Sequence, residues 1–275
     1  MAFALDGPVV LAGAGKMGAA LLAGWVSRGL RPGDVIVQDP HPSEDAAELA
    51  RQHGISIVPL IDALPVPPSI IVAAVKPQAM DAVFPPLAKH AGPNTVVMSI
   101  AAGRSLSSFE RHLPQRTAVV RAMPNTPAAI GRGITGAVGN THVSADQKRL
   151  CQELLSAVGD VVWLDDETLI DAVTAVSGSG PAYVFLLTET LARAGEAAGL
   201  DSATSMQLAR ATVSGAGELL RRFESDPSAL RQNVTSPGGT TAAALSVLMR
   251  EKDGLQELMT AAVLAAQKRG RELGN

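Results

Sequence analysis

The glycine-rich stretch of residues 13–18 constrains the fold more than any other feature of this chain. It reads Gly-Ala-Gly-Lys-Met-Gly, and it separates an apolar run at residues 8–11 from a helical pattern. Glycines at this spacing between a strand and a helix are typical of dinucleotide-binding folds. The first glycine makes the tight turn, the second admits the pyrophosphate to the backbone, and the third lets helix and strand pack closely. The candidate cofactor-binding residues of this stretch are Gly13, Gly15, Lys16, Met17 and Gly18.

The strand expected at residues 35–39 ends in a carboxylate, Asp39. It follows the third glycine by about 20 residues, where such folds place an acidic side chain on the ribose 2′-hydroxyl. A carboxylate at this position repels a 2′-phosphate. The only nearby donors are His41 and Ser43, and the loop contains no arginine. Asp39 therefore favours NADH over NADPH.

Residues 1–164 alternate β-rich runs with helical patterns, which is typical of an α/β domain with a parallel sheet and crossover helices. Strands are expected at residues 8–11, 35–39, 55–58, 69–75, 95–100, 117–123, 133–138 and 160–164. Later helices of this half are expected at residues 43–53, 78–90 and 146–158. Ligands of such sheets bind outside the carboxyl ends of the strands. Two of these ends add the candidate cofactor-binding residues Ala74, Val75, Lys76, Pro77 and Ala102.

Residues 165–275 lack strand signals and are expected to form a second, all-helical domain. Its helices are expected at residues 166–176, 181–199, 202–223, 239–250 and 252–273. The segment 182–200 is apolar on nearly every side, and a helix of that kind must be buried. Because the rest of this half is too small to cover the segment, we expect a second subunit to contribute, in an interleaved helical dimer.

Two glycine-containing turns in the helical half are candidate ligand sites. In Ser177–Pro181, small residues precede a proline that suits the first turn of a helix, so the backbone could approach a nicotinamide ring. The stretch Asn233–Thr241 leads into a helix whose free N–H groups form a carboxylate site. An ordinary helix–turn–helix and a threonine-capped helix are the respective alternatives.

The composition of the 275 residues argues against several classes of function. Cys151 is the only cysteine and is expected to be buried, so an internal disulfide and a multi-cysteine metal site are excluded, and no metal is expected. A net charge of −3 and an aromatic content of 3% argue against nucleic acid as a partner. No apolar run approaches the ~20 residues of a membrane span. The N-terminus also lacks a signal-peptide pattern, so we expect a cytoplasmic protein.

Six motifs together resemble the pyrroline-5-carboxylate reductase family. They occupy residues 13–18, 74–77, 124–127, 169–173, 177–183 and 233–241. The resemblance covers essentially the whole chain, although the glycine motif is shared with many dehydrogenases. It implies a Rossmann-type domain followed by a helical domain that forms intertwined dimers, which often assemble into decamers. It also implies the reduction of 1-pyrroline-5-carboxylate to L-proline by NADH or NADPH, the last step of proline synthesis.

The resemblance also implies roles for individual residues. Backbone N–H groups around Gly238, Gly239 and Thr240 would hold the substrate carboxylate. The hydroxyl of Thr241 would hydrogen-bond the ring nitrogen, which makes it the candidate catalytic residue. Further residues implied are Glu167 and Ser179 for the substrate and Asn233 for the cofactor. Glu224 also matches the pattern, but a solvated carboxylate at a helix end is the alternative for it.

Cofactor and reaction each retain an alternative. The family tends towards NADPH, and some members carry an asparagine near Ile61, whose side chain cannot donate to a phosphate. The combination of Asp39 and Ile61 nevertheless favours NADH. A related imine or β-hydroxy acid oxidoreductase is the nearest rival. The hydroxy acid enzymes typically place a lysine in the helical domain, and residues 166–249 contain none. A non-catalytic dinucleotide-binding redox sensor is the other alternative.

Overall fold

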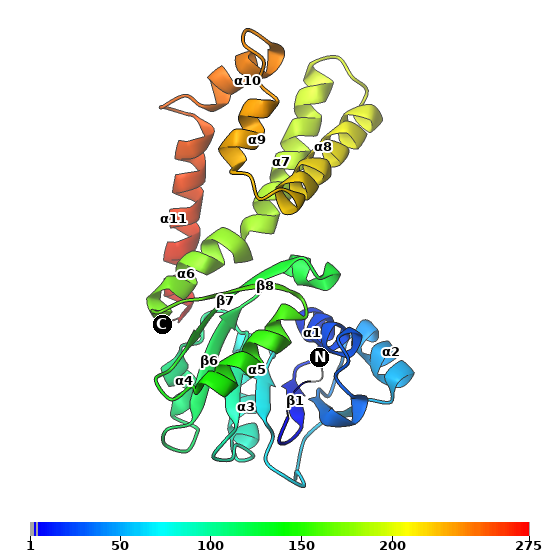
Figure 1. The fold of residues 1–275 in the computed structure, drawn as a ribbon, viewed down its shortest axis with the longest axis vertical. Helices are drawn as coiled ribbons and strands as arrows, with labels where there is room; N and C mark the ends of the chain where they lie inside the picture. Colours follow the sequence, from blue (N-terminus) through cyan, green and yellow to red (C-terminus); the bar gives the residue numbers. More distant parts are fainter. Residues whose placement is uncertain (1–2, 4, 275) are drawn as a thin grey trace. The chain divides into compact units, whose positions relative to one another are not determined.

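The computed structural model of this protein describes residues 3 and 5–274. It divides into two compact units, Met1–Gly178 with Gln267–Asn275, and Ser179–Ala266. The first unit contains the sheet and the second is helical. Figure 1 labels their helices and strands, and each unit is described by itself below.

One eight-stranded sheet organises the first unit. Its strands are β1 (Val9–Ala12), β2 (Val35–Gln38), β3 (Ser56–Val58), β4 (Ile70–Ala73), β5 (Val96–Ser99), β6 (Ala118–Met123), β7 (Gly133–Gly139) and β8 (Gly159–Trp163). They lie in the order β3-β2-β1-β4-β5-β6-β7-β8. Every strand predicted from the sequence is present, and the α/β class is confirmed.

The predicted parallel sheet is confirmed, with the exception of one antiparallel pair. Strand β7 pairs antiparallel with β6, while β8 is parallel to β7. Strands β6 and β7 are joined by a short connection that contains a single 3₁₀ turn, Thr126–Ile130. A parallel pairing needs a crossover of a dozen or more residues, and this connection is too short for one.

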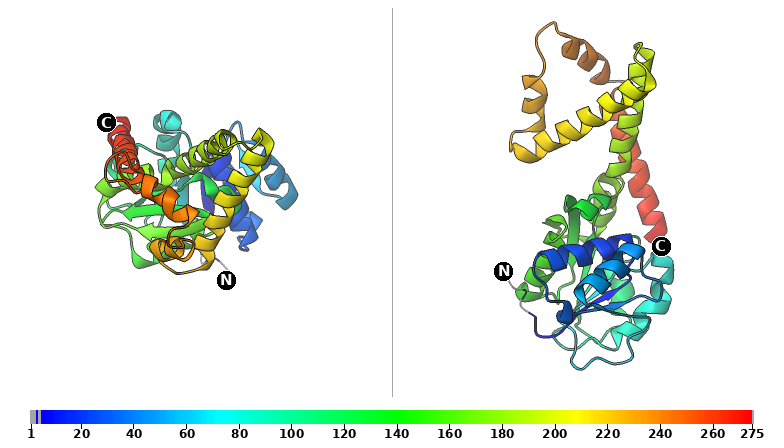
Figure 2. Two further views of the ribbon diagram at one scale, coloured as in Figure 1. Left: turned by 90° about the horizontal axis from the view of Figure 1, so that it is seen from above. Right: turned by 90° about the vertical axis from the view of Figure 1, so that its right-hand side faces the viewer.

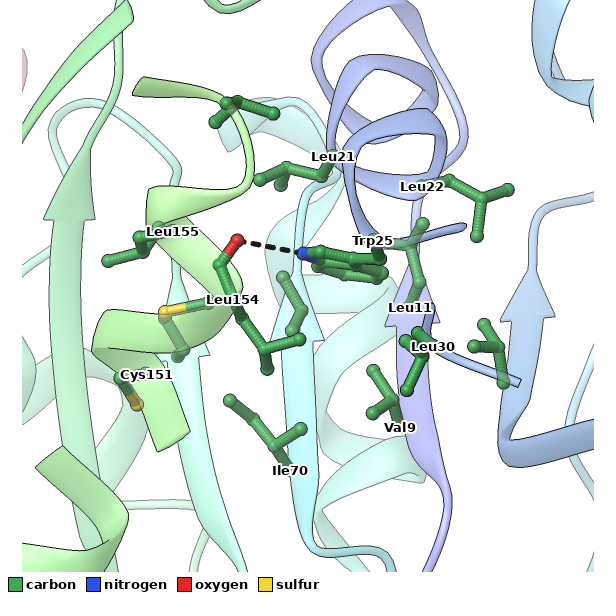
Figure 3. Packing of buried hydrophobic residues seen from close by; sticks show 14 of the residues in the cluster. Val9, Leu11, Leu21, Leu22, Trp25, Leu30, Ile70, Cys151, Leu154 and Leu155 are labelled. Atoms are coloured by element: carbon green, nitrogen blue, oxygen red, sulfur yellow. Dashed lines mark hydrogen bonds between the residues drawn. The ribbon is translucent and has the colours of Figure 1, made fainter. Parts of the chain in front are cut away.

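Helices cover both faces of the sheet. The first unit contains α1 (Lys16–Ser27), α2 (Glu44–His53), α3 (Met80–Ala88), α4 (Leu106–Glu110) and α5 (Ala145–Ser156). On one face, Trp25 of α1 packs into the larger buried cluster and donates its indole N–H to the carbonyl of Leu154 on α5, at 2.9 Å (Figure 3). On the other face, Phe84 of α3 meets Phe109 of α4 edge to face at 4.9 Å. The short α4 was not predicted.

The stretch Ser177–Pro181 is not the loop that the sequence suggested. A 3₁₀ turn at Glu167–Leu169 leads into α6 (Ile170–Val173), and a π-helical turn at Thr174–Gly178 leads on towards the next helix. The chain is thus nearly continuously helical over Glu167–Ala197. Small and hydroxyl-bearing residues suggested a break, but they also fit the wider π turn.

By length and apolar character, the helix Glu167–Ala197 could cross a membrane. This corrects the expectation that no segment approaches such a span. That expectation counted uninterrupted apolar runs, whereas glycine, serine and threonine interrupt this segment without adding charge. Only 11% of its apolar window is buried within this chain.

The second unit is a set of helices. They are α7 (Gly180–Ala197), α8 (Ser202–Arg222), α9 (Pro227–Asn233), α10 (Thr240–Leu248) and most of α11 (Leu255–Gly274). Helices α7 and α8 meet at a tight turn, contact each other near it at Gly195 and Ser205, and diverge from there (Figure 2). Helix α9 was not predicted. Large apolar side chains of α7 stay uncovered in the single chain, and Phe185 is 64% exposed.

Candidate functional site

The glycine loop has the geometry that a bound pyrophosphate requires. Gly13 has a φ of +97°, and a Cβ there would come within 2.6 Å of the backbone carbon of Ala74. Gly15 is exposed, has open space around its Cα, and caps α1 without a side-chain hydrogen bond. Helix α1 begins at Lys16, and no side chain caps its N-terminus. Its first N–H groups and the positive end of its dipole are therefore available to an anion. The loop therefore fits a phosphate-bearing ligand.

The carboxylate of Asp39 is bound to the glycine loop itself. One oxygen accepts the N–H of Ala14 at 2.6 Å, and the other accepts the N–H of His41 at 2.8 Å. These bonds fix the carboxylate beside the loop at the end of β2. Ile61 lies in the core at 6% exposure, and its N–H donates to the side chain of Gln38 at 2.8 Å. Its side chain therefore offers nothing polar to a cofactor.

Ser43 provides a second tether for the glycine loop that sequence reasoning did not identify. Its N–H and its hydroxyl both donate to the carbonyl of Ala14, at 2.9 and 2.8 Å. The same hydroxyl accepts the N–H of Ala46 and caps α2. The signal available in the sequence was only that a serine precedes a helix, which does not indicate the distant carbonyl that it binds.

The other predicted cofactor residues line the carboxyl ends of β4 and β5. The N–H of Ala74 donates to the carbonyl of Ala12 at 2.7 Å, which places the β4 end directly beside the end of β1. Val75 is half-buried, Lys76 is exposed, and Pro77 opens a 3₁₀ turn. Ala102 is exposed after β5. These residues and the glycine loop share one edge of the sheet.

Two cavities of the first unit lie outside the glycine loop. One of about 380 Å³ is lined by Pro77, Gln78, Gly103, Arg104, Ser105, Ser108, Arg111 and Leu273. It lies along the carboxyl edge, next to the predicted cofactor residues. The other, of about 730 Å³, is lined by residues that precede β4 and β5, such as Ser69 and Thr95, and by residues of α5. Within residues 3 and 5–274, no group of three or more His, Cys, Asp or Glu side chains is arranged to hold a metal ion.

Glu167 is held in the first unit by two donors. Its Oε1 accepts the backbone N–H of Leu106, at the start of α4, at 2.8 Å, and a guanidinium N–H of Arg121 at 3.0 Å. The guanidinium also lies 3.7 Å from the carboxylate of Asp171. Arg121 is only 8% exposed, on the buried strand β6. Sequence reasoning missed it, although an arginine within an apolar strand signals a buried partner.

The predicted carboxylate site in the second unit has the expected local geometry. Gly238 adopts a φ of +70°, and Gly239 caps α10 with no side-chain hydrogen bond. The helix begins at Thr240, and Thr241 is half-buried in its first turn. No threonine side chain caps the helix, which disagrees with the threonine-capped alternative. Asn233 ends α9 and is exposed.

Ser179 lies at the N-terminus of one helix, and Glu224 lies beyond the C-terminus of another. Ser179 is half-buried at the N-terminus of α7, and its side chain makes no capping hydrogen bond. Glu224 is exposed just beyond the end of α8. Of the two interpretations offered for Glu224, its exposure agrees with the solvated carboxylate.

Comparison with known proteins identifies the family. The family model for the pyrroline-5-carboxylate reductase dimerisation domain matches residues 167–273. A second model, for coenzyme F420-dependent NADP oxidoreductases, matches residues 8–103. The first match includes the long apolar helix and the glycine turn before α10. The second includes the glycine loop and the ends of β2, β4 and β5.

Relatives and solved structures agree with these matches. A pyrroline-5-carboxylate reductase of Pseudomonas aeruginosa is 42% identical over 265 residues, which cover 96% of each chain. The structure of the Coxiella burnetii enzyme superposes with a TM-score of 0.90 at 34% identity, over 98% of this chain and 99% of the other. The Plasmodium falciparum enzyme, solved with NADP bound, has a TM-score of 0.78 at 26% identity and covers 98% and 99%. The resemblance noted in the sequence is thereby confirmed, and this chain belongs to the pyrroline-5-carboxylate reductase family.

Proposed function

We propose that this chain reduces 1-pyrroline-5-carboxylate to L-proline with a reduced nicotinamide dinucleotide, as the last step of proline synthesis. The observation on which this rests most is the pair of uncapped helix N-termini, each preceded by glycine. Helix α1 follows Gly15 and helix α10 follows Gly239, and neither has a side-chain cap. Two such termini suit the two kinds of anion in this reaction, a pyrophosphate and a substrate carboxylate.

The cofactor residues bind and orient the dinucleotide. The N–H groups at the start of α1 receive the pyrophosphate, and the open space at Gly15 lets it approach. Lys16 and Met17 follow in the first turn, and Gly18 lets the helix pack on the loop. The segments Ala74–Pro77 and Ala102 at the strand ends, with Asn233, orient the nicotinamide half. When bound, the nicotinamide supplies the hydride, and the protein contributes position and electrostatics.

The substrate residues bind the cyclic imine through its acid group. N–H groups of Gly238, Gly239 and Thr240 hold the carboxylate at the positive end of α10. The hydroxyl of Thr241 hydrogen-bonds the ring nitrogen, where charge changes as the C=N carbon receives hydride. Ser179 and Glu167 complete the substrate site. A protonated imine is already electrophilic, so the chain needs neither a nucleophile nor a metal for this step.

The preferred cofactor is NADH. The support is that the hydroxyl of Ser43 and the backbone N–H groups of His41 and Ile61 are already bonded, which leaves the exposed imidazole of His41 as the nearby donor. The hydroxyl of Ser43 donates to the carbonyl of Ala14, and the N–H of His41 donates to Asp39 itself. The N–H of Ile61 is bound inside the core. A 2′-phosphate would thus meet the fixed carboxylate of Asp39 with only the imidazole of His41 in compensation, whereas a ribose hydroxyl can donate to that carboxylate.

The assembly includes at least a homodimer. We divide the chain into a dinucleotide-binding domain at residues 1–164 and a substrate-binding and dimerisation domain at 165–275. The uncovered apolar side chains of α7 support a partner subunit as the cover for this helix, in place of a membrane. The proposal also includes the further association of dimers into a decamer. It places the protein in the cytoplasm, without a nucleic-acid partner.

The decisive experiment uses the purified full chain with 1-pyrroline-5-carboxylate and either cofactor. We expect the absorbance of reduced nicotinamide to fall, L-proline to appear in equal amount, and kcat/KM to be at least about tenfold higher with NADH, the value of one charge-assisted contact. Cofactor binding without turnover of this substrate would refute the reductase activity and favour the redox sensor. Turnover of a β-hydroxy acid alone would favour the rival oxidoreductase. A preference for NADPH would refute the cofactor assignment only.

A further inference from the structure

The π-helical turn at Thr174–Gly178 is tied to the end of the sheet by Asn125. The side-chain amide of Asn125 donates to the carbonyl of Ser177 at 3.2 Å. The residue four positions after Ser177 is Pro181, which has no N–H, so the Ser177 carbonyl needs another donor. π turns occur frequently at functional sites. Asn125 belongs to the motif at residues 124–127, for which the reaction described above assigns no role.

The orientation of the Asn125 amide is fixed by a second hydrogen bond. Its carbonyl oxygen accepts the backbone N–H of Ile134 at 2.9 Å, so the NH₂ group must face Ser177. The residue is 8% exposed, which shields both bonds from water. Asn125, which follows the end of β6, therefore joins two elements through one rigid amide. Its oxygen is bonded to the start of β7, and its NH₂ group is bonded to the π turn.

The π turn and Val173, the last residue of α6 just before it, also pack tightly on these two strands. A Cβ on Gly136 of β7 would come within 2.7 Å of the side chain of Val173. A Cβ on Gly178 would come within 3.0 Å of the Cε of Met123. With so little room, the asparagine bond selects one backbone course for Ser177 and Gly178, which lead directly into Ser179.

We propose that Asn125 is a positioning residue for the reaction, which acts through Ser177 and Gly178 to set the place of Ser179 at the substrate. The proposal rests on the proposed function, because it takes Ser179 as a substrate contact. The polar atoms of the Asn125 side chain are bonded to Ser177 and Ile134, so the proposal assigns it no contact of its own with cofactor or substrate. Its loss should thus change the handling of the imine while the affinity for dinucleotide is retained.

The test is the substitution Asn125→Asp in the full-length protein. A carboxylate keeps the acceptor for the N–H of Ile134, but it removes the donor to Ser177 and brings negative charge against that carbonyl. We expect kcat/KM for 1-pyrroline-5-carboxylate to fall about tenfold, the usual effect of one hydrogen bond. The Kd of NADH, measured by fluorescence without substrate, should stay within about twofold.

The matched control is Asn140→Asp in the same pair of strands. The side chain of Asn140 accepts the N–H of Val119 at 3.2 Å and donates to the carbonyl of Thr117 at 3.0 Å. It also donates to the carboxylate of Glu110 at 2.8 Å, so a carboxylate at position 140 would meet at least as much local repulsion as one at position 125. Like Asn125 it bonds to backbone with both ends of its amide, but it has no bond to the π turn. We expect a comparable fall in Tm with kinetic constants close to those of the parent. An equal loss of kcat/KM in both variants would show a merely structural role and overturn the proposal.

A double-mutant cycle with Ser179→Ala tests the route of the effect. If Asn125 acts through Ser179, adding Asn125→Asp to Ser179→Ala should lower kcat/KM by less than about twofold. If the two substitutions instead lower kcat/KM by independent factors that multiply in the double variant, the proposal is overturned. Should the parent protein fail to reduce this imine, the proposed function fails, and hydrogen exchange of residues 174–182 then decides whether Asn125 holds the turn. If hydrogen exchange of these residues is the same in Asn125→Asp as in the parent, the conclusion that Asn125 holds the π turn is overturned as well.

Discussion

Arg121 and Glu167 form a hydrogen-bonded ion pair at 3.0 Å between a buried strand and the 3₁₀ turn that begins the helical stretch. The same Glu167 oxygen also accepts the N–H of Leu106 at 2.8 Å. Asp171, one helical turn further on, adds a second carboxylate 3.7 Å from the guanidinium. The pair therefore connects β6, α4 and the stretch that leads into the π turn. The proposed contact of Glu167 with the substrate would therefore depend on the position that Arg121 gives to its carboxylate.

Replacement of Arg121 should destabilise the protein more than replacement of Glu167. Arg121→Met leaves two carboxylates without their cation, and we expect a loss of about 3 kcal/mol in the free energy of unfolding. Glu167→Gln keeps an acceptor for Leu106 and leaves Asp171 to the arginine, so the loss should be about 1 kcal/mol. Urea unfolding measures both. An equal or reversed order would show that the buried arginine does not depend on these carboxylates.

Asp39→Ser should change cofactor selectivity. It removes the charge that repels a 2′-phosphate, but it also removes the acceptor of the Ala14 N–H at 2.6 Å. We expect the ratio of the Kd values for NADPH and NADH to fall about 10- to 100-fold, mainly through weaker NADH binding. Titration of each cofactor by fluorescence gives the ratio.

Ser43→Ala is the matched control for that substitution. It removes the hydroxyl bond to the carbonyl of Ala14 without changing the charge. Both cofactors should bind a few-fold more weakly while their ratio stays constant. A change of selectivity in Ser43→Ala would mean that the serine, rather than Asp39, distinguishes the two cofactors.

The features that sequence predicted well depend on local patterns. The glycine loop before α1, the turn before α10 and all eight strands follow from spacing, apolar periodicity and helix-start residues within a few positions of each other. The features that were missed depend on distant partners. Arg121 and Glu167 are 46 residues apart, and Asn125 and Ser177 are 52 apart. No local pattern records which residues meet across the sheet.

Two features of the structure differ from the sequence predictions for the same reason, because both depend on contacts outside the local segment. The antiparallel direction of β7 depends on the length of its connection to β6, whereas apolar patterning is identical for strands of either direction. The small residues at 177–181 favour a turn locally, but Ser177 and Gly178 lie in a π turn packed against the ends of β6 and β7, and α7 begins directly after Ser179. Tertiary contacts thus override a weak local preference.

Thr241→Ala should lower kcat for 1-pyrroline-5-carboxylate about 10- to 100-fold, because a positioned hydrogen bond to the reacting imine is lost. The Kd of NADH should be unchanged. Thr235→Ala is a suitable control, since the hydroxyl of Thr235 donates to the carbonyl of Arg231 at the end of α9. That control should keep its kcat. Unchanged steady-state turnover in Thr241→Ala would remove the hydroxyl from the mechanism.

Cys151 should resist thiol reagents in the folded protein. Burial raises the pKa of its thiol to about 12 from the ordinary 9.0, so almost no thiolate forms at neutral pH. A chromogenic disulfide reagent should therefore react with one thiol in urea and with none in buffer. Rapid reaction in buffer would show that the helix α5 around Cys151 opens frequently.

The same pKa shift predicts a pH dependence of stability. The folded-state pKa lies above the unfolded value, so the stabilising contribution is complete below pH 9 and is lost as the pH rises towards about 12. Over that range the free energy of unfolding should fall more steeply in the parent than in Cys151→Ala. Identical slopes would contradict the shift.

Leu186→Glu should dissociate the dimer. Leu186 lies on α7 and is 56% exposed in the single chain, within the apolar helix that we assign to the subunit interface. A charge buried there without a partner costs several kcal/mol in association free energy, which is enough to separate subunits at micromolar concentration. Leu60→Glu is the matched control, because Leu60 is 52% exposed in the first unit, between β3 and β4. Sedimentation velocity should give a monomer for the first variant and the parent's assembly for the second. A persistent dimer in Leu186→Glu, or dissociation by Leu60→Glu, would place the interface on another surface.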